Sequence, residues 1–135
     1  MATPQLFKRL QLPKASRALM LNAPPEFLTL LHEPPEFQFD QSPAGKYDYA
    51  QLFARDLAEL DRLIEAVLPA IEFDALLWIC YPKGSSGIKT DINRDIIWKH
   101  LAGLGIRPVT QLAIDETWSA MRMRPIELVK SKSLG

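Results

Sequence analysis

The sequence predicts an α/β fold, a single three-layer Rossmann-like sandwich whose mainly parallel sheet ends in an antiparallel hairpin. Residues 75–81 (ALLWICY) form the most apolar run of the chain, which is typical of a strand buried on both faces. Residues 57–68 carry leucine, isoleucine and valine at helical spacing, and strand-like runs lie on both sides of them. Strands that alternate with helices are joined by right-handed crossovers, which makes neighbouring strands parallel and covers the sheet with helices.

The remaining elements follow in chain order. Strands are expected at 18–23, 37–40, 47–54, 75–81, 108–114 and 118–123, and helices at 26–32, at 57–68 and from Thr90-Asp91 to Gly103. Asp56 is expected to cap the second helix, with Glu59 completing a capping box. Residues 1–17 are basic and form an N-terminal arm or a short element, residues 18–125 form one domain, and residues 126–135 form a C-terminal tail.

The composition excludes several classes of protein. A chain of 135 residues with 47% hydrophobic content can bury one core. The single cysteine, Cys80, cannot form an internal disulfide, so the chain is not expected to be a disulfide-stabilised secreted domain. The sequence contains no apolar segment of membrane-spanning length and no signal-peptide core, so we expect a cytoplasmic protein. The net charge of zero gives no argument for a nucleic acid or a membrane as partner.

The charges are nevertheless unevenly distributed along the chain. Residues 18–82 carry eleven acids against three bases, whereas residues 83–135 carry nine bases against five acids. This distribution makes the C-terminal half the side that meets an anion. The alternative is that the acidic part simply complements the basic part.

The loop after the central strand is the first candidate site. It contains Lys83, Gly84, Ser85, Ser86, Gly87, Ile88, Lys89 and Thr90. A phosphate-binding P-loop requires Gly-Lys-Ser/Thr without interruption, and Ile88 separates Gly87 from Lys89, so nucleotide hydrolysis is not expected. Backbone N–H groups, serines, lysines and a helix N-terminus can still hold a phosphate, a sulfate or a carboxylate. The alternative is an ordinary strand-to-helix connection with solvated lysines.

The second candidate site lies at the start of the final strand. Asp115, Glu116, Trp118 and Ser119 occur within five residues, and Arg122 shares one face of that strand with Trp118. These side chains can line a pocket, or the acids can cap a turn while the tryptophan packs and the arginine forms an ion pair. The candidate ligand-binding residues of both sites are Lys83, Ser85, Ser86, Lys89, Thr90, Asp91, Asp115, Glu116, Trp118, Ser119 and Arg122.

The sequence offers little for catalysis. Cys80 lies in the buried strand, where a thiol behaves as an inert apolar group. The two histidines, His32 and His100, have no partners at metal-ligand spacing, so no metal is expected. The sequence lacks Gly-x-Ser-x-Gly and Gly-x-Gly-x-x-Gly, so we expect no catalytic residue and no cofactor.

Two motifs resemble those of a small bacterial family of unknown function. The motifs are YPK-x-S-S-x-I-x-T-D, at 81–91, and A-I-D-E-T-W-S, at 113–119. The resemblance runs from Ala18 to Pro125 and implies no activity, but it favours Lys83, Ser85, Asp91, Asp115, Trp118 and Ser119 as site residues. Separately, the order of elements is similar to the C-terminal half of a Rossmann-like methyltransferase, a similarity of topology that by itself implies no function.

Both motifs are expected at the same edge of the sheet, because the carboxyl ends of parallel strands lie together. We call residues 83–91 and 115–119 the rim. A lysine of the first segment can pair there with Asp115 or Glu116, either as a structural latch that only fixes the loop or as the floor of a pocket.

Three hypotheses for the function remain open. The leading one is a non-catalytic binding or interaction protein with an anion-accepting rim. The second is a degenerate methyltransferase-like domain or other transferase that uses the same rim. The third is a subunit that homodimerises through a sheet edge or an apolar helix face.

Overall fold

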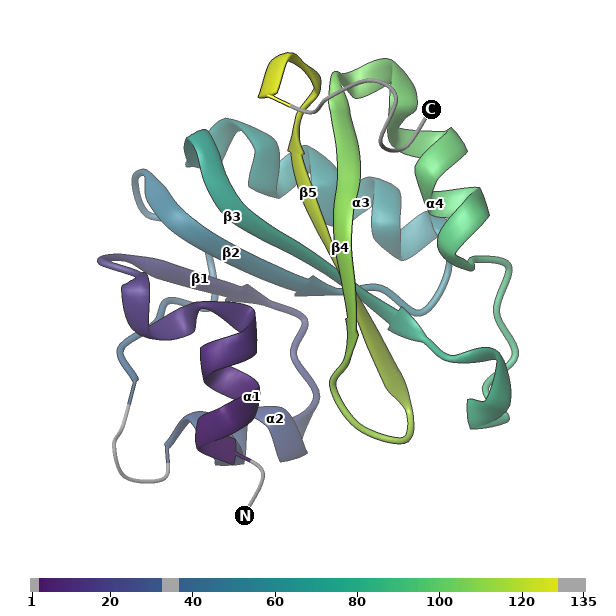
Figure 1. Ribbon diagram of the computed structural model, residues 1–135, viewed down its shortest axis with the longest axis horizontal. Helices are drawn as coiled ribbons and strands as arrows, with labels where there is room; N and C mark the ends of the chain where they lie inside the picture. Colours follow the sequence, from purple (N-terminus) through teal and green to yellow (C-terminus); the bar gives the residue numbers. More distant parts are fainter. Residues whose placement is uncertain (1–2, 33–36, 129–135) are drawn as a thin grey trace.

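A computed structural model describes residues 3–32 and 37–128, which form an α/β fold around one five-stranded sheet (Figure 1). The strands are β1 (Ala18–Leu21), β2 (Tyr47–Phe53), β3 (Ile71–Pro82), β4 (Ile106–Ala113) and β5 (Trp118–Pro125), in the order β1-β2-β3-β5-β4. The helices are α1 (Thr3–Leu10), α2 (Pro25–Leu31), α3 (Leu57–Val67) and α4 (Arg94–Leu101). Strands β1 to β4 run in one direction and β5 runs in the other. The α/β class and a mostly parallel sheet are confirmed.

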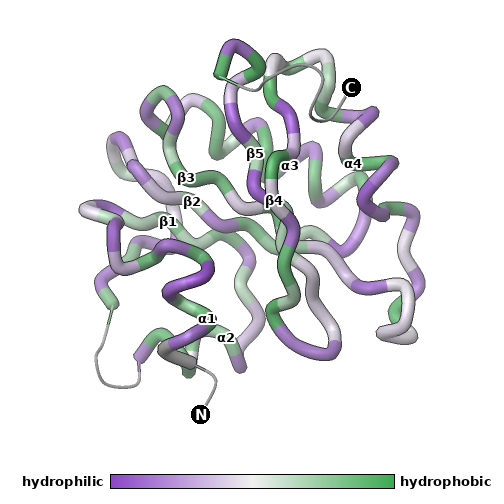
Figure 2. The backbone as a smooth tube through the Cα atoms, viewed as in Figure 1, coloured by the Kyte–Doolittle hydropathy of each residue, from purple (hydrophilic) through white to green (hydrophobic). Residues whose placement is uncertain are grey.

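Helices cover both faces of the sheet. On β3, Leu77 and Ile79 point to the side of α3 and α4, whereas Trp78 and Cys80 point to the side of α1 and α2. Successive side chains of a strand point to opposite faces, so an apolar run without alternation has to be buried on both. Figure 2 shows hydrophobic residues along β3, at the centre of the sheet, and hydrophilic ones in the hairpin loop between β4 and β5.

The closing hairpin differs from its expected place. Strands β4 and β5 are antiparallel, as predicted, but β5 lies between β3 and β4, so the hairpin does not add an antiparallel edge. Strand β4 is the edge, and it contains Pro108 and a register shift at Val109. Proline lacks the N–H that an interior strand donates, and a bulge disturbs pairing, so β4 is suited to the edge.

The basic N-terminal segment is an element of the fold and not a free arm. Residues Thr3–Leu10 form α1, and a 3₁₀ turn follows at Leu12–Lys14. The apolar side chains of this segment are buried: Leu6, Phe7, Leu10 and Leu12. The indole N–H of Trp78 donates to the carbonyl of Leu10 at 2.9 Å, which fixes the end of α1 on the sheet. The basic charge of this segment did not predict that it packs on the core, because its buried apolar residues alternate with its basic ones.

Three other elements differ in detail from expectation. Residues 37–40 form only one bridge, in which Asp40 pairs with Leu19. Helix α4 begins at Arg94 and not at Thr90-Asp91, because the side chain of Asn93 accepts the N–H of Ile96 at 2.9 Å. Of the predicted C-terminal tail, residues 126–128 form a 3₁₀ turn, and residues 129–135 lie outside the described part of the chain. In the described residues, no helix is long and apolar enough to cross a membrane.

Between β1 and β2 the chain changes the side on which it adds the next strand. Asp40 lies on the outer side of β1, and the next strand, β2, lies on the inner side. The connecting loop passes Arg17, which donates to the carbonyl oxygens of Ala44 and Lys46 at 3.0 and 3.2 Å. Helices α2 and α3 therefore leave β1 and β2 toward opposite faces, which makes the gap between the carboxyl ends of these strands a topological switch point.

Replacing Leu10 tests whether α1 belongs to the core. We expect Leu10→Ala to lower the free energy of unfolding by about 2–5 kcal/mol, because the side chain is fully buried and its removal leaves a cavity. Urea denaturation measures the change. The exposed neighbour Lys8→Ala is the control and should change stability by no more than about 0.5 kcal/mol. Equal, small effects of both substitutions would show that α1 is dispensable.

The ion pair between Asp74 and Arg124 makes stability depend on pH. Arg124 donates to both carboxylate oxygens at 2.9 and 2.7 Å, and this bonding holds the pKa of Asp74 below its usual value. The pair therefore stabilises the fold above the Asp74 pKa of the unfolded chain, and this contribution disappears as the pH falls through the lower pKa of the folded chain. The stability difference between the wild type and Arg124→Met should be constant near neutrality and shrink below about pH 4.

Urea denaturation between pH 7 and pH 2.5 measures that difference. Arg94→Met is the control, since the ion pair of Arg94 with its neighbour Asp95, at 3.6 Å, lies on the surface. A difference for Arg124→Met that did not change with pH would contradict the pairing.

Candidate functional site

The two sequence motifs meet at the carboxyl edge of the sheet, as predicted. The backbone N–H of Lys83 donates to the carbonyl of Thr117 at 2.8 Å, and Pro82 is the register partner of Trp118. The segment that follows β3 and the hairpin between β4 and β5 are therefore neighbours in space.

The loop after β3 is held by its own turn and by the turn between β2 and α3. Gly87 has a φ of 84°, which suits glycine, and the hydroxyl of Ser86 accepts the N–H of Ile88 at 3.2 Å. The hydroxyl of Thr90 donates to the carbonyl of Arg55 at 2.5 Å. A carboxylate oxygen of Asp91 accepts the N–H of Leu57 at 2.8 Å. Thr90 and Asp91 thus fix the loop to the start of α3.

The predicted pairing of lysine and carboxylate does not form. Within residues 3–32 and 37–128, neither Lys83 nor Lys89 makes an ion pair with Asp115 or Glu116. The loop is fastened by Thr90 and Asp91 instead, which leaves the two lysine ammonium groups available to an anion.

The residues of the second motif have mainly structural contacts. A carboxylate oxygen of Asp115 accepts the N–H groups of Thr117 and Trp118, both at 2.8 Å, which closes the hairpin turn. Glu116 is exposed. Trp118 is only 7% exposed, and its ring packs edge-on against Phe53 on the side of α1 and α2. These contacts support the alternative in which Asp115 caps a turn and Trp118 packs in the core.

Ser119 and Arg122 lie on opposite faces of β5. Ser119 is buried beside Tyr81 on the side of α3 and α4. Arg122 pairs in register with Trp78, three residues along β5 from the end of the rim at Ser119, and faces the side of α1 and α2. Among the described residues its Nε is buried without a hydrogen-bond partner, and burial lowers the pKa of Arg122. Arg122 is therefore not brought together with the rim.

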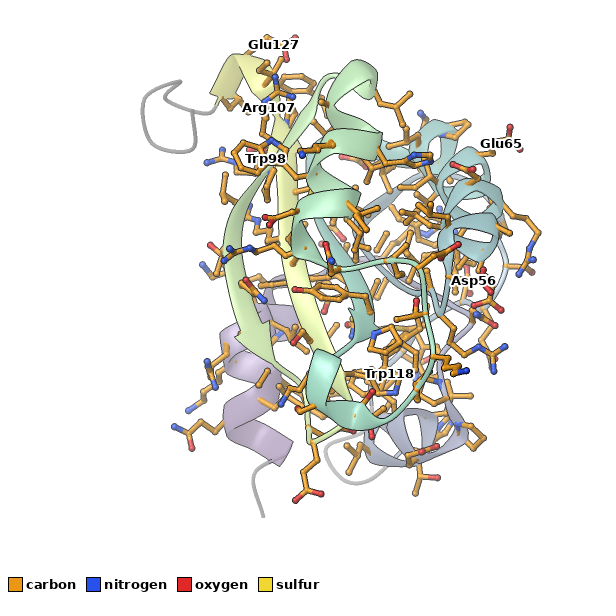
Figure 3. The ribbon with its side chains drawn as sticks, turned by 90° about the vertical axis from the view of Figure 1, so that its right-hand side faces the viewer. Asp56, Glu65, Trp98, Arg107, Trp118 and Glu127 are labelled. Carbon is orange, nitrogen blue, oxygen red and sulfur yellow. The ribbon has the colours of Figure 1, made fainter. Side chains whose placement is uncertain are left out.

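A cavity of about 710 Å³ lies beside the rim. We call it the rim cavity; its lining is Asp56, Tyr81, Pro82, Gly84, Ile88, Lys89, Thr90, Asp91, Ile92 and Asn93. Asp56 and Asn93 are the N-caps of α3 and α4, so the amino ends of both helices border this cavity. Figure 3 labels Asp56 at the start of α3. A helix N-terminus carries partial positive charge, which favours an anion.

The side chains of Asn22 and Glu59 lie at the switch point and bond each other. Asn22 follows β1 with a φ of 62°, a conformation that asparagine tolerates, and its amide donates to the carbonyl of Phe53 at 2.7 Å and to Glu59 at 3.3 Å. Glu59 also accepts the backbone N–H of Arg55 at 2.8 Å and pairs with the Arg55 guanidinium at 2.9 Å. These bonds with Arg55 lower the pKa of Glu59. The expected capping box is thus incomplete: Asp56 caps α3, but Glu59 bonds Arg55 and not Asp56.

The buried polar groups near β3 do not form a reactive centre. Burial raises the pKa of the Cys80 thiol far above its usual value, so the thiolate is not available. Burial also raises the pKa of Tyr81, although Arg94 and hydrogen bonds from Ser119 and Gln111 oppose it. In the described part of the chain, no three His, Cys, Asp or Glu side chains are grouped so that they could hold a metal ion.

Solved structures of methyltransferases resemble this fold. Ribosomal protein L11 methylase from Lactobacillus delbrueckii subsp. bulgaricus matches with a TM-score of 0.54 at 11% identity, over 91% of this chain and 78% of the methylase. A putative methyltransferase from Pseudomonas syringae matches with a TM-score of 0.51 at 15% identity, over 92% of this chain and 100% of that protein. LepI in complex with SAM matches with a TM-score of 0.52 at 13% identity, over 92% of this chain and 40% of LepI.

At this level of identity the likeness concerns the fold alone. The methyltransferase-like topology predicted from the order of elements is thereby supported. No protein-family model and no curated protein sequence matches the chain. The resemblance to a small bacterial family therefore stays a prediction.

Several residues of the site were not singled out from the sequence. Asn93 could have been predicted from the sequence, because asparagine is a preferred N-cap residue and Asn93 directly precedes the helical pattern of α4. Asn22 had none, since its role depends on β1 lying beside β2 and the first turn of α3.

Replacing Asp91 tests the fastening of the loop. We expect Asp91→Ala to lower the free energy of unfolding by about 1 kcal/mol and to speed amide exchange in residues 84–92, because the N–H of Leu57 loses its acceptor. Hydrogen-exchange NMR and urea denaturation measure both effects. Asp95→Ala removes an exposed carboxylate nearby and should change neither the free energy of unfolding nor the amide exchange of the loop. Equal effects of the two substitutions would show that Asp91 does not hold the loop.

Proposed function

We propose that this chain is a degenerate methyltransferase-like domain, folded as a single three-layer sandwich, that binds a small anionic ligand in the rim cavity. One observation carries the proposal: Asn22 and Glu59 are joined by a hydrogen bond at the switch point between β1 and β2, while the rim cavity beside it is open. Ligands of open α/β sheets bind outside the carboxyl ends of the strands at such a switch point. Here the open space is displaced toward β3.

The hydrogen-bond donors around the rim cavity suit an anion, and the charged side chains of its lining are one lysine, Lys89, and two carboxylates, Asp56 and Asp91. The carboxylates of Asp56 and Asp91 are each engaged by a backbone N–H, from Glu59 and Leu57 respectively. Lys89 is exposed at the cavity wall and has no acidic partner within the described residues. Together with the amino ends of α3 and α4, this lysine supplies donors suited to a phosphate, a sulfate or a carboxylate.

A transferase is the second candidate function. The methylase and the putative methyltransferase with a similar fold, and LepI in complex with SAM, favour it. For a nucleoside cofactor to occupy the switch point, the side chains of Asn22 and Glu59 would have to leave their present hydrogen bonds. The sequence also lacks the glycine-rich cofactor loop.

An amide NMR titration with phosphate, acetate, nucleotides and S-adenosylmethionine tests both functions. We expect phosphate or a nucleotide to shift the amides of residues 83–91 and 115–119, with weaker binding at high salt. Lys89→Ala should weaken the binding about ten-fold, the effect of losing one charge-assisted hydrogen bond. Lys99→Ala, which removes an exposed lysine from the last turn of α4, is the matched control.

The outcomes separate the two functions. Shifts by S-adenosylmethionine at Asn22, Arg55 and Glu59 would favour the transferase and count against the anion site as the main function. If no compound moved the rim amides, or if Lys99→Ala weakened binding as much as Lys89→Ala, the anion site would be refuted.

A further inference from the structure

A second cavity, of about 430 Å³, lies between α4 and the edge strand β4. We call it the α4–β4 cavity. Its apolar wall comes from Trp98 on α4, from Pro108 and Val109 on β4, and from Met121 on β5. Its volume falls within the range of about 300–1,000 Å³ that small-molecule sites occupy, and such sites are mostly apolar with a few polar groups.

Trp98 is the tryptophan that is least buried. Trp78 and Trp118 are 1% and 7% exposed, whereas Trp98 is half-buried. Figure 3 shows Trp98 on the side of α4 that faces β4. Within the described residues, its indole N–H makes no hydrogen bond to the protein. A tryptophan ring left open beside an apolar wall offers a stacking surface for another flat ring.

The polar groups of this cavity come from Arg94 and Asp95 at the start of α4, from Thr110 and Gln111 on β4, and from the strand edge. The amide nitrogen of Gln111 donates to the hydroxyl of Tyr81 at 2.6 Å, which leaves the Gln111 carbonyl oxygen free to accept a further bond. Strand β4 pairs on one side only, with β5, so alternate backbone groups point outward.

The exposed edge of β4 is not suited to pairing with a further strand. Pro108 lacks an N–H, and the register shift at Val109 bends the strand, so a further strand cannot pair continuously with β4. The volume, the flat apolar wall and the free carbonyl of Gln111 match a small ring instead.

We infer that the α4–β4 cavity binds a planar heteroaromatic ring, which stacks on Trp98 and donates an N–H to the carbonyl of Gln111. This site is separate from the rim cavity, because Tyr81 lines the rim cavity and Gln111 lines the other, and their hydrogen bond lies between the two. It does not depend on an anion at the rim.

A titration with adenine, a planar ring with N–H donors, tests this site; cyclohexanol, which is apolar but not planar, serves as the comparison compound. We expect adenine to quench Trp98 fluorescence to saturation and to shift the Trp98 indole N–H and the amides of Val109 and Gln111. Cyclohexanol should bind at least ten-fold more weakly. Quenching that rises linearly without saturation, or equal affinity for the two compounds, would overturn the inference.

Variants separate stacking on Trp98 from a general apolar effect. Trp98→Ala should abolish the adenine shifts at Val109 and Gln111, and Trp98→Phe should keep them at reduced affinity. Phe73→Ala is the control, because Phe73 is 69% exposed and precedes the buried part of β3, at the opposite edge of the sheet from the rim. Equal weakening by Phe73→Ala and Trp98→Ala would contradict the site. Phosphate binding at the rim should be unchanged in all three variants, which keeps this result distinct from that of the anion titration.

Discussion

The fold depends on β3 burying both of its faces. Leu77 and Ile79 need the cover of α3 and α4, while Trp78 and Cys80 need that of α1 and α2, so the chain has to supply helices to both sides of one strand. Trp78 adds a directional constraint, because its buried indole N–H requires an acceptor and finds it at the carbonyl of Leu10. The packing of the N-terminal segment follows from this one strand at the centre of the sheet.

Placing helices on both faces requires the chain to change direction within the sheet. Because crossovers are right-handed, α2 and α3 reach opposite faces only if the chain moves outward after β1 and inward after β2. The part of the sheet on the outer side of β2 consists of β1, with α2 following it, and the single bridge of Asp40. Arg17 donates to the carbonyl oxygens of Ala44 and Lys46 and so fixes the loop that leads from Asp40 to β2. Tyr47 joins both ends of this path, since its hydroxyl bonds Asp40 and its ring lies under the Arg17 guanidinium. At the switch point, the amide of Asn22 donates to Glu59 and joins the segment after β1 to the first turn of α3.

The rim cavity lies beside the switch point. The side chains of Asp56, Thr90 and Asp91 form hydrogen bonds that fix the start of α3 and the loop after β3. The rim cavity is bordered by the amino ends of α3 and α4. The insertion of β5 between β3 and β4 makes β4 an edge, and the α4–β4 cavity lies along it. The fold resembles that of solved methyltransferases, and the α4–β4 cavity lies along the interrupted edge strand of this chain.

The sequence by itself determined the class of fold, helix α3 with its Asp56 cap, the buried strand β3, the β4–β5 hairpin and the meeting of the two motifs at one edge. These features depend on periodicity, local capping and the geometry of parallel strands, all of which are encoded over short stretches. Only the tertiary structure decided that β5 is interior, that α1 belongs to the core, that Trp118 packs on Phe53, and that Asn22 reaches Glu59. Each of these contacts joins residues that are far apart in the chain, and a contact between distant residues depends on how the whole core is assembled and leaves no local pattern.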